Sequence, residues 1–138
     1  MQMGGLTMKK NGILNPQLNR VISEMGHRDM LIIADAGLPI PKGVERIDLA
    51  LKCGIPPFSD VLRAVLSELE VEEAYVAKEI KEKNSQTLNL VSSLMGMREV
   101  KFITHEELKE LSKQARAIVR TGECSPYANI ILISGVTF

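Results

Sequence analysis

The hydrophobic and polar positions of this 138-residue chain follow two kinds of pattern. Continuous apolar runs, which are typical of strands buried on both faces of a sheet, occupy residues 30–37 and 130–133. Residues 15–26 instead show helical periodicity, and Asn15 with Pro16 gives that helix a capped start. We therefore predict two central strands and an N-terminal helix. The first strand should deliver an aspartate to its C-terminal end.

The rest of the chain continues this alternation of strands and helices. We predict a half-buried strand at residues 44–51, a helix at 56–70 and a short strand at 72–77. A charged connection at 78–86, a weak helix at 87–96 and a further strand at 99–103 follow. Thr104 and Glu107 fit a capping box that starts a helix, and this helix should run to Gly122 with His105 in its first turn. The alternation predicts an α/β fold: a single three-layer domain with a mostly parallel or mixed central sheet and helices on both faces.

The charge balance and the cysteines narrow the classes of function. Lys and Arg total 17, as do Asp and Glu, so the chain has no basic field for nucleic acid or for a membrane surface. No apolar run reaches the ~20 residues that span a bilayer, and the N-terminus lacks the apolar core of a signal peptide. We therefore expect a cytoplasmic protein. Cys53 and Cys124 form no CxxC pair, so we expect reduced thiols, and two histidines make a poor zinc site.

Five polar residues lie where the predicted strands and helices meet their loops. Each has an ordinary structural explanation by itself, such as a solvated histidine after a helix or an aspartate that bonds to turn amides. Phosphate-binding loops of the GxxxxGK[ST] and GxGxxG types are missing from the sequence, as is the GxSxG motif of serine hydrolases. The five residues are His27, Asp35, His105, Tyr127 and Asn129.

Three stretches together resemble one family. The segments are NGILNPQLNRVISEMGHRDMLIIADAGLPIPKGVERIDLAL, THEEL and RTGECSPYANIILISGVTF, and they resemble the D-ribose pyranase and L-fucose mutarotase family, most closely its pyranase branch. The resemblance covers residues 8–138, which we take as one sugar pyranase domain, and is weakest between Lys78 and Arg98. Residues 1–7 lie outside it as an N-terminal extension.

The resemblance implies an isomerase that interconverts the pyranose and furanose forms of free D-ribose without a cofactor or a metal. It further implies a ring-like homo-oligomer, typically a decamer, with sites near subunit contacts. Carried over by motif, His27 in GHRD matches the catalytic residue. The positions that match substrate-binding residues are Asp35 in ADAGLP, His105 in THEE, and Tyr127, Ala128 and Asn129 in PYAN.

The chemistry of these side chains is compatible with that activity. Ring opening of a hemiacetal needs one proton removed from the anomeric hydroxyl and one delivered to the ring oxygen. A histidine can serve in both directions near neutral pH. Two other functions use the same residues and stay open: a fucose-type mutarotase that exchanges anomers, and a non-catalytic sugar-binding subunit.

Overall fold

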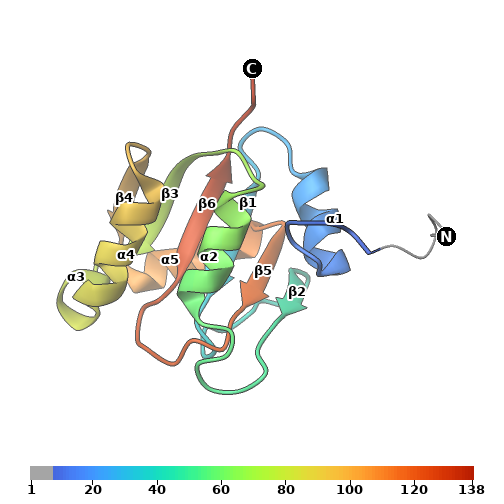
Figure 1. The fold of residues 1–138 in the computed structure, drawn as a ribbon. Coiled ribbons are helices and arrows are strands. Elements are labelled where there is room, and N and C mark those ends of the chain that lie inside the picture. Colours follow the sequence, from blue (N-terminus) through green and yellow to red (C-terminus); the bar gives the residue numbers. More distant parts are fainter. Residues whose placement is uncertain (1–7) are drawn as a thin grey trace, which may run out of the picture.

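The computed structural model describes residues 8–138 and has a six-stranded mixed sheet at its centre (Figure 1). The strand order is β2-β5-β1-β6-β3-β4, and only β6 runs antiparallel to its neighbours. The strands are β1 (Met30–Ala34), β2 (Glu45–Asp48), β3 (Val71–Ala77), β4 (Glu99–Ile103), β5 (Ala117–Arg120) and β6 (Ile130–Ser134). Residues 1–7, which we predicted to be an extension, lie outside the described part.

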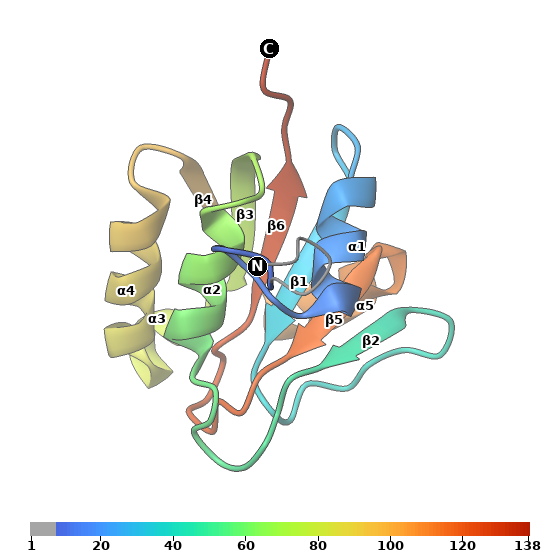
Figure 2. The same cartoon turned by 45° about the vertical axis from the view of Figure 1, so that its right-hand side comes forward.

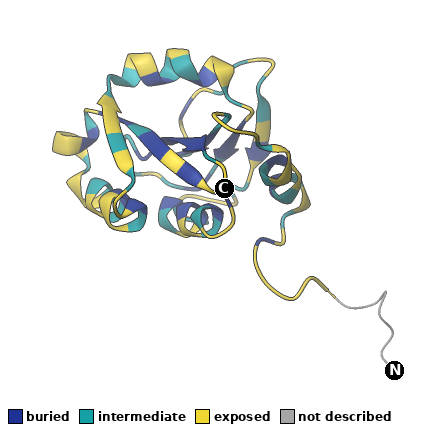
Figure 3. Cartoon of the chain, turned by 90° about the horizontal axis from the view of Figure 1, so that it is seen from above, coloured by how far each residue is buried: buried dark blue, intermediate teal, exposed yellow. Residues whose placement is uncertain are grey.

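Helices cover both faces of the sheet, which confirms the predicted three-layer α/β domain (Figures 2 and 3). One face packs against α1 (Pro16–Glu24), α2 (Phe58–Leu66) and α4 (Ser85–Met95). The other face packs against α5 (His105–Leu111), whose Leu108 is fully buried. A short helix, α3 (Ile80–Lys83), precedes α4.

The central strands are apolar throughout because each is buried from both sides. In β1, Leu31 and Ile33 contribute to the core under α1 and α2, whereas Ile32 and Ala34 contribute to the core under α5. All five residues of β6 are buried as well. This double burial accounts for the continuous apolar runs of the sequence.

Two predicted elements differ from the structure. The helix expected to run from residue 104 to Gly122 ends at Leu111, and Ala117–Arg120 forms the parallel strand β5 beside β1. The residues Ala117, Ile118 and Val119 are fully buried on both faces of the sheet, a position that suits β-branched side chains. The connection expected at residues 78–86 contains α3 and the start of α4.

The cysteines also depart from expectation. Cys53 and Cys124, predicted to be reduced, are paired as a disulfide in this structure, with Cα atoms 5.8 Å apart. The pair joins the loop after β2 to the loop between β5 and β6. In residues 8–138, no helix has the length and apolar character needed to cross a bilayer.

Candidate functional site

The topology of the sheet brings one group of the predicted residues together. Because β6 is antiparallel to β1, Ile130 pairs with Ile33, and the loop before β6 lies beside the end of β1. Asp35 directly follows β1 and Asn129 directly precedes β6. The strands β3 and β4 run parallel to β1 and end at the same edge of the sheet, where α5 then begins with His105.

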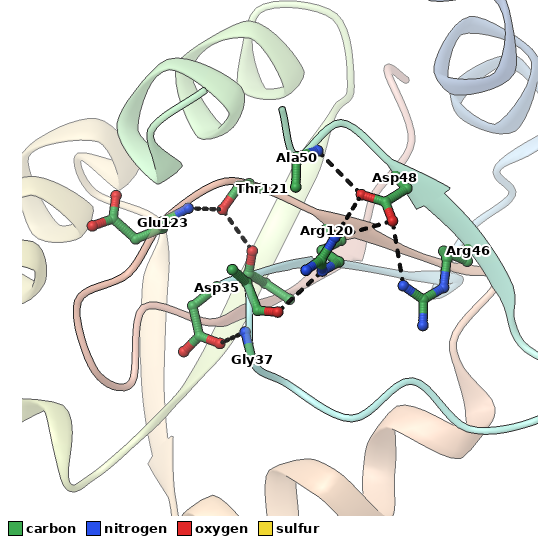
Figure 4. A network of polar contacts seen from close by, with 10 residues as sticks. Asp35, Gly37, Arg46, Asp48, Ala50, Arg120, Thr121 and Glu123 are labelled. Carbon is green, nitrogen blue, oxygen red and sulfur yellow. Dashed lines mark hydrogen bonds and ion pairs between the residues drawn. The ribbon is translucent and has the colours of Figure 1, made fainter. Parts of the chain in front are cut away.

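Asp35 and Asn129 form a reciprocal pair at this edge. The backbone N–H of Asp35 donates to Asn129 Oδ1 at 2.8 Å, and Asn129 Nδ2 donates to Asp35 Oδ2 at 3.2 Å. Asn129 is only 1% exposed. The backbone N–H of Gly37 donates to the other carboxylate oxygen at 3.0 Å (Figure 4).

Burial dominates the electrostatics of Asp35. It raises the pKa of this carboxyl above its ordinary value of 3.8, against the opposing effects of hydrogen bonds from Gly37 and Asn129 and of the nearby His105. The carboxylate is therefore held in place by donors but is poorly solvated. A group of this kind can accept a hydrogen bond from a ligand hydroxyl, which replaces the hydrogen bond that water would otherwise supply.

His105 and Tyr127 form the second half of the cluster. Their rings meet edge to face, with centroids 5.1 Å apart and planes at 85°. The backbone N–H of His105 donates to both carboxylate oxygens of Glu79, at 3.0 and 3.2 Å, and Thr104 caps α5 as predicted. The ring atom Nδ1 of His105 is buried and has no hydrogen-bond partner within residues 8–138. A buried, unpaired imidazole nitrogen is costly unless a ligand supplies the partner.

Tyr127 adopts a backbone conformation that residues other than glycine rarely take. Its φ of 58° lies in the left-handed region, which is uncommon for an aromatic residue. The next residue, Ala128, is fully buried in the hydrophobic core. Strained residues of this kind tend to occur where geometry serves a ligand.

A hollow of about 410 Å³ adjoins this cluster, lined by Asp35, Ala36, Gly37, Glu123, Cys124, Ser125 and Pro126. Side-chain hydrogen bonds and an ion pair hold the loops around this hollow in place. Arg120 donates to the carbonyl of Ala36 at 3.0 Å and is paired with Asp48 (Figure 4). Glu123 accepts from the backbone N–H of Phe58 and from the hydroxyl of Ser125. The loops that line the hollow are thus fixed by polar contacts to the surrounding elements.

His27 lies at the opposite end of the sheet. It follows α1 and precedes β1, and its Nε2 is 3.4 Å from a carboxylate oxygen of Glu72, near the start of β3. The strand β1 has five residues, which corresponds to about 16 Å of chain between the two ends. The side chain of His27 is 55% exposed. The structure therefore gathers Asp35, His105, Tyr127 and Asn129 but separates His27 from them within one chain.

Sequence reasoning missed four charged residues that support these positions: Arg28, Glu72, Glu79 and Glu123. Each makes a contact with a residue that is distant along the chain, such as the contact between Arg28 and Glu72, which are 44 positions apart. Periodicity and short motifs report on neighbours within a few turns. They carry no signal for contacts of this range.

The fold and the polar cluster define a class: a single-domain α/β protein with a candidate small-ligand site of carboxylate, amide, imidazole and phenol groups beyond the strand ends. A model of the RbsD / FucU transport protein family matches residues 8–137. The chain belongs to this family, which confirms the resemblance seen in the sequence.

Individual relatives agree with this assignment. The chain is 55% identical to a D-ribose pyranase of Laribacter hongkongensis, over 95% of this chain and 100% of that protein. The structure of Bacillus subtilis RbsD complexed with D-ribose superposes with a TM-score of 0.92 at 46% identity, covering 95% of this chain and 100% of that one. A fucose mutarotase from Streptococcus pneumoniae, solved with L-fucose, gives a TM-score of 0.75 at 26% identity, with 90% and 94% covered.

Proposed function

We propose that the chain is an isomerase that interconverts the pyranose and furanose forms of free D-ribose. The observation that carries the proposal is the cluster of Asp35, His105, Tyr127 and Asn129 at the strand ends. It presents a fixed acceptor, an amide, a phenol and an unpaired imidazole nitrogen. Such a set matches the donors and acceptors of a polyol without requiring net charge. The D-ribose pyranases that align over nearly the whole chain support the same substrate.

The reaction moves protons without a change of oxidation state. A base takes the proton of the anomeric hydroxyl, the bond between the anomeric carbon and the ring oxygen breaks, and an acid protonates the released oxygen. The open aldehyde then rotates, a different hydroxyl of the same sugar attacks it, and the proton transfers run in reverse. We assign the proton transfer to His27 and the binding of the sugar to the cluster. The family resemblance includes Ala128, between Tyr127 and Asn129, in the binding group.

His27 must therefore come from another copy of the chain. In one chain the sheet separates it from the cluster, whereas a neighbouring copy can present its own His27, which is 55% exposed. A contact between two different ends of the same molecule is heterologous, and repetition of such a contact closes into a ring when the rotation allows it. This supports the homo-oligomer implied by the family resemblance. The decamer and the cytoplasmic location stay predictions.

The activity is tested by saturation-transfer NMR between the ring forms of ribose, with and without the protein. We expect faster pyranose to furanose exchange when the protein is present. A protein that binds ribose but leaves this exchange at its uncatalysed rate would be a sugar-binding subunit. Faster exchange of fucose anomers with no effect on ribose ring size would instead indicate a mutarotase.

The shared site is tested by mixing two impaired variants at a ribose concentration well below saturation, where weakened binding and a missing proton shuttle both lower the exchange rate. His27→Ala lacks the proton shuttle and Asn129→Ala lacks part of the cluster. When the two are coexpressed in equal amounts, a site between copies receives an intact His27 and an intact Asn129 in about a quarter of cases. We expect the coexpressed variants to exchange ribose faster than the two variants purified separately and then assayed together, with oligomer size checked by sedimentation.

A site formed within a single chain predicts a different result. A site formed within one chain regains no activity on mixing, because every chain carries one of the two lesions. Coexpressed oligomers that sediment like the wild type but show only the mean activity of the two variants would contradict the shared site. The wild type sedimenting as a monomer would contradict it as well.

A further inference from the structure

The His27 end of the sheet carries a set of ion pairs that the proposed reaction has not used. Glu72 places one carboxylate oxygen 3.4 Å from His27 Nε2 and the other 2.8 Å from an Arg28 nitrogen. Arg28 also pairs with Glu73, which in turn pairs with Lys101 at 2.9 Å. The five residues form a linked series of ion pairs in which positive and negative charges alternate, and the series ends at the imidazole of His27.

Arg28 is fixed in this arrangement by its backbone. Its φ of 72° is in the left-handed region, which is unusual for a residue with a long side chain. Its N–H donates to the carbonyl of Ser134 at 2.8 Å, so the turn that carries His27 is tied to the end of β6. The conformation directs the guanidinium toward Glu72 and Glu73 on β3. Strain that a structure maintains in this way often accompanies function.

We infer that Glu72 is a positioning residue for His27: it orients the imidazole so that the opposite ring nitrogen, Nδ1, faces the sugar. This inference rests on the proposed role of His27. The carboxylate approaches only one side of the ring, at Nε2, and so selects the nitrogen that stays available for proton transfer. Glu72 thus corresponds to the group that orients the base in a catalytic triad, and Arg28 in turn fixes its carboxylate.

The ionisation of Glu72 fits this role. Hydrogen bonding from Arg28 lowers the pKa of Glu72 below its ordinary value, and His27 contributes in the same direction. The carboxylate is therefore charged whenever the imidazole works near neutral pH. A charged acceptor stabilises the imidazolium that forms when His27 takes a proton, which matters in the transition state more than in the bound ground state.

The test compares Glu72→Gln with a matched control, Glu70→Gln. Glu70 has the same charge two positions earlier, and its carboxylate makes none of the ion pairs found in residues 8–138. Ribose exchange should show a kcat roughly tenfold lower for Glu72→Gln with little change in KM, because a misplaced shuttle impairs only the chemical step. Glu70→Gln should keep the wild-type kcat. Equal kcat values for Glu72→Gln and the wild type would overturn the inference.

A double-mutant cycle shows whether Glu72 acts through His27. In a His27→Ala background, Glu72→Gln should cause no further loss of exchange, since the group that it positions is gone. A further loss of the same size as in the wild-type background would overturn the inference while leaving the proposed function intact. The proposed role of His27 fails separately, if His27→Ala exchanges ribose as fast as the wild type.

Folding and assembly are checked by melting temperature and sedimentation for each variant. Should Glu72→Gln fail to assemble, Glu72→Asp takes its place. That variant keeps the charge but shortens the side chain, so kcat should fall while KM is retained. A rise in KM with an unchanged kcat in either variant would assign Glu72 to the structure of the interface and overturn the positioning role.

Discussion

At the end of the sheet where β1 stops, Asp35 and Asn129 adjoin apolar strands and are bonded to each other, with Asn129 buried and Asp35 partly buried. At the end where β1 starts, His27 stands in a surface network of charged residues. The first end is organised by burial, which leaves Asn129 only 1% exposed. The second is organised by ion pairs, with Arg28 holding Glu72 beside the imidazole.

The difference matches the tasks proposed for the two ends. A binding cluster gains from rigid, desolvated donors and acceptors, because they are already paired to the backbone and need no reorganisation when the sugar enters. In the proposed function, the proton shuttle reaches a site on another copy, which requires a position at the surface. The proposal therefore predicts that binding and chemistry are separable by mutation.

The largest effect should come from His27→Ala. We expect kcat for ribose exchange to fall by roughly 100-fold or more, since general acid–base catalysis typically contributes that much. Ribose affinity, measured by calorimetry, should be largely retained because the cluster is intact. If the variant exchanged ribose at the wild-type rate at saturating sugar, then His105 or Tyr127 would become the candidate shuttle.

Asn129→Ala should act in the opposite sense, weakening binding more than chemistry. The substitution leaves the Asp35 N–H and carboxylate without their partner, and a buried unpaired group costs about 1–3 kcal/mol. Denaturant unfolding and calorimetry should both record a loss. Asn19→Ala is the control. Its Nδ2 donates to backbone carbonyls near α1 and its Oδ1 accepts from Lys9, so the substitution should change stability without changing ribose affinity.

Much of the fold could be predicted from the sequence, because local patterns encode it. The cap at Asn15, the capping box at Thr104 and the apolar runs of β1 and β6 all occur as expected. The error at Ala117–Arg120 has a physical cause. A run that is buried on both faces fits a strand and the end of an amphipathic helix equally well in a short window, and only pairing with β1 decides between them.

The candidate residues could be named from the sequence, but their arrangement could not. The family resemblance pointed to Asp35, His105, Tyr127 and Asn129 as binding residues, which stays a prediction, and the direction of β6 explains why they lie together. That His27 lies at the other end depends on how the chain runs through the sheet, which no single motif records. The partners Glu72 and Glu79 were missed because their contacts span distant parts of the chain.

The smallest expected effect is on the pH dependence of stability, in which the carboxylates at the two ends of the sheet should differ. Burial raises the pKa of Asp35 above 3.8, whereas ion pairing with Arg28 lowers those of Glu72 and Glu73. A raised folded-state pKa means that the folded chain binds this proton more tightly than the unfolded chain. The stability from Asp35 is thus fully present below pH 3.8 and is lost as pH rises through the folded-state pKa.

Asp35→Ala isolates this contribution, since the carboxylates at the other end are unchanged. The free energy of unfolding of the wild type minus that of the variant should decrease as pH rises from acid toward neutrality. The change should be small because solvent reaches part of the carboxyl group. Denaturant titrations at a series of pH values measure it. A difference that instead grew with pH would mean that donors such as Gly37 and Asn129 outweigh burial, and that the binding end, like the His27 end, favours the ionised form of its carboxylate.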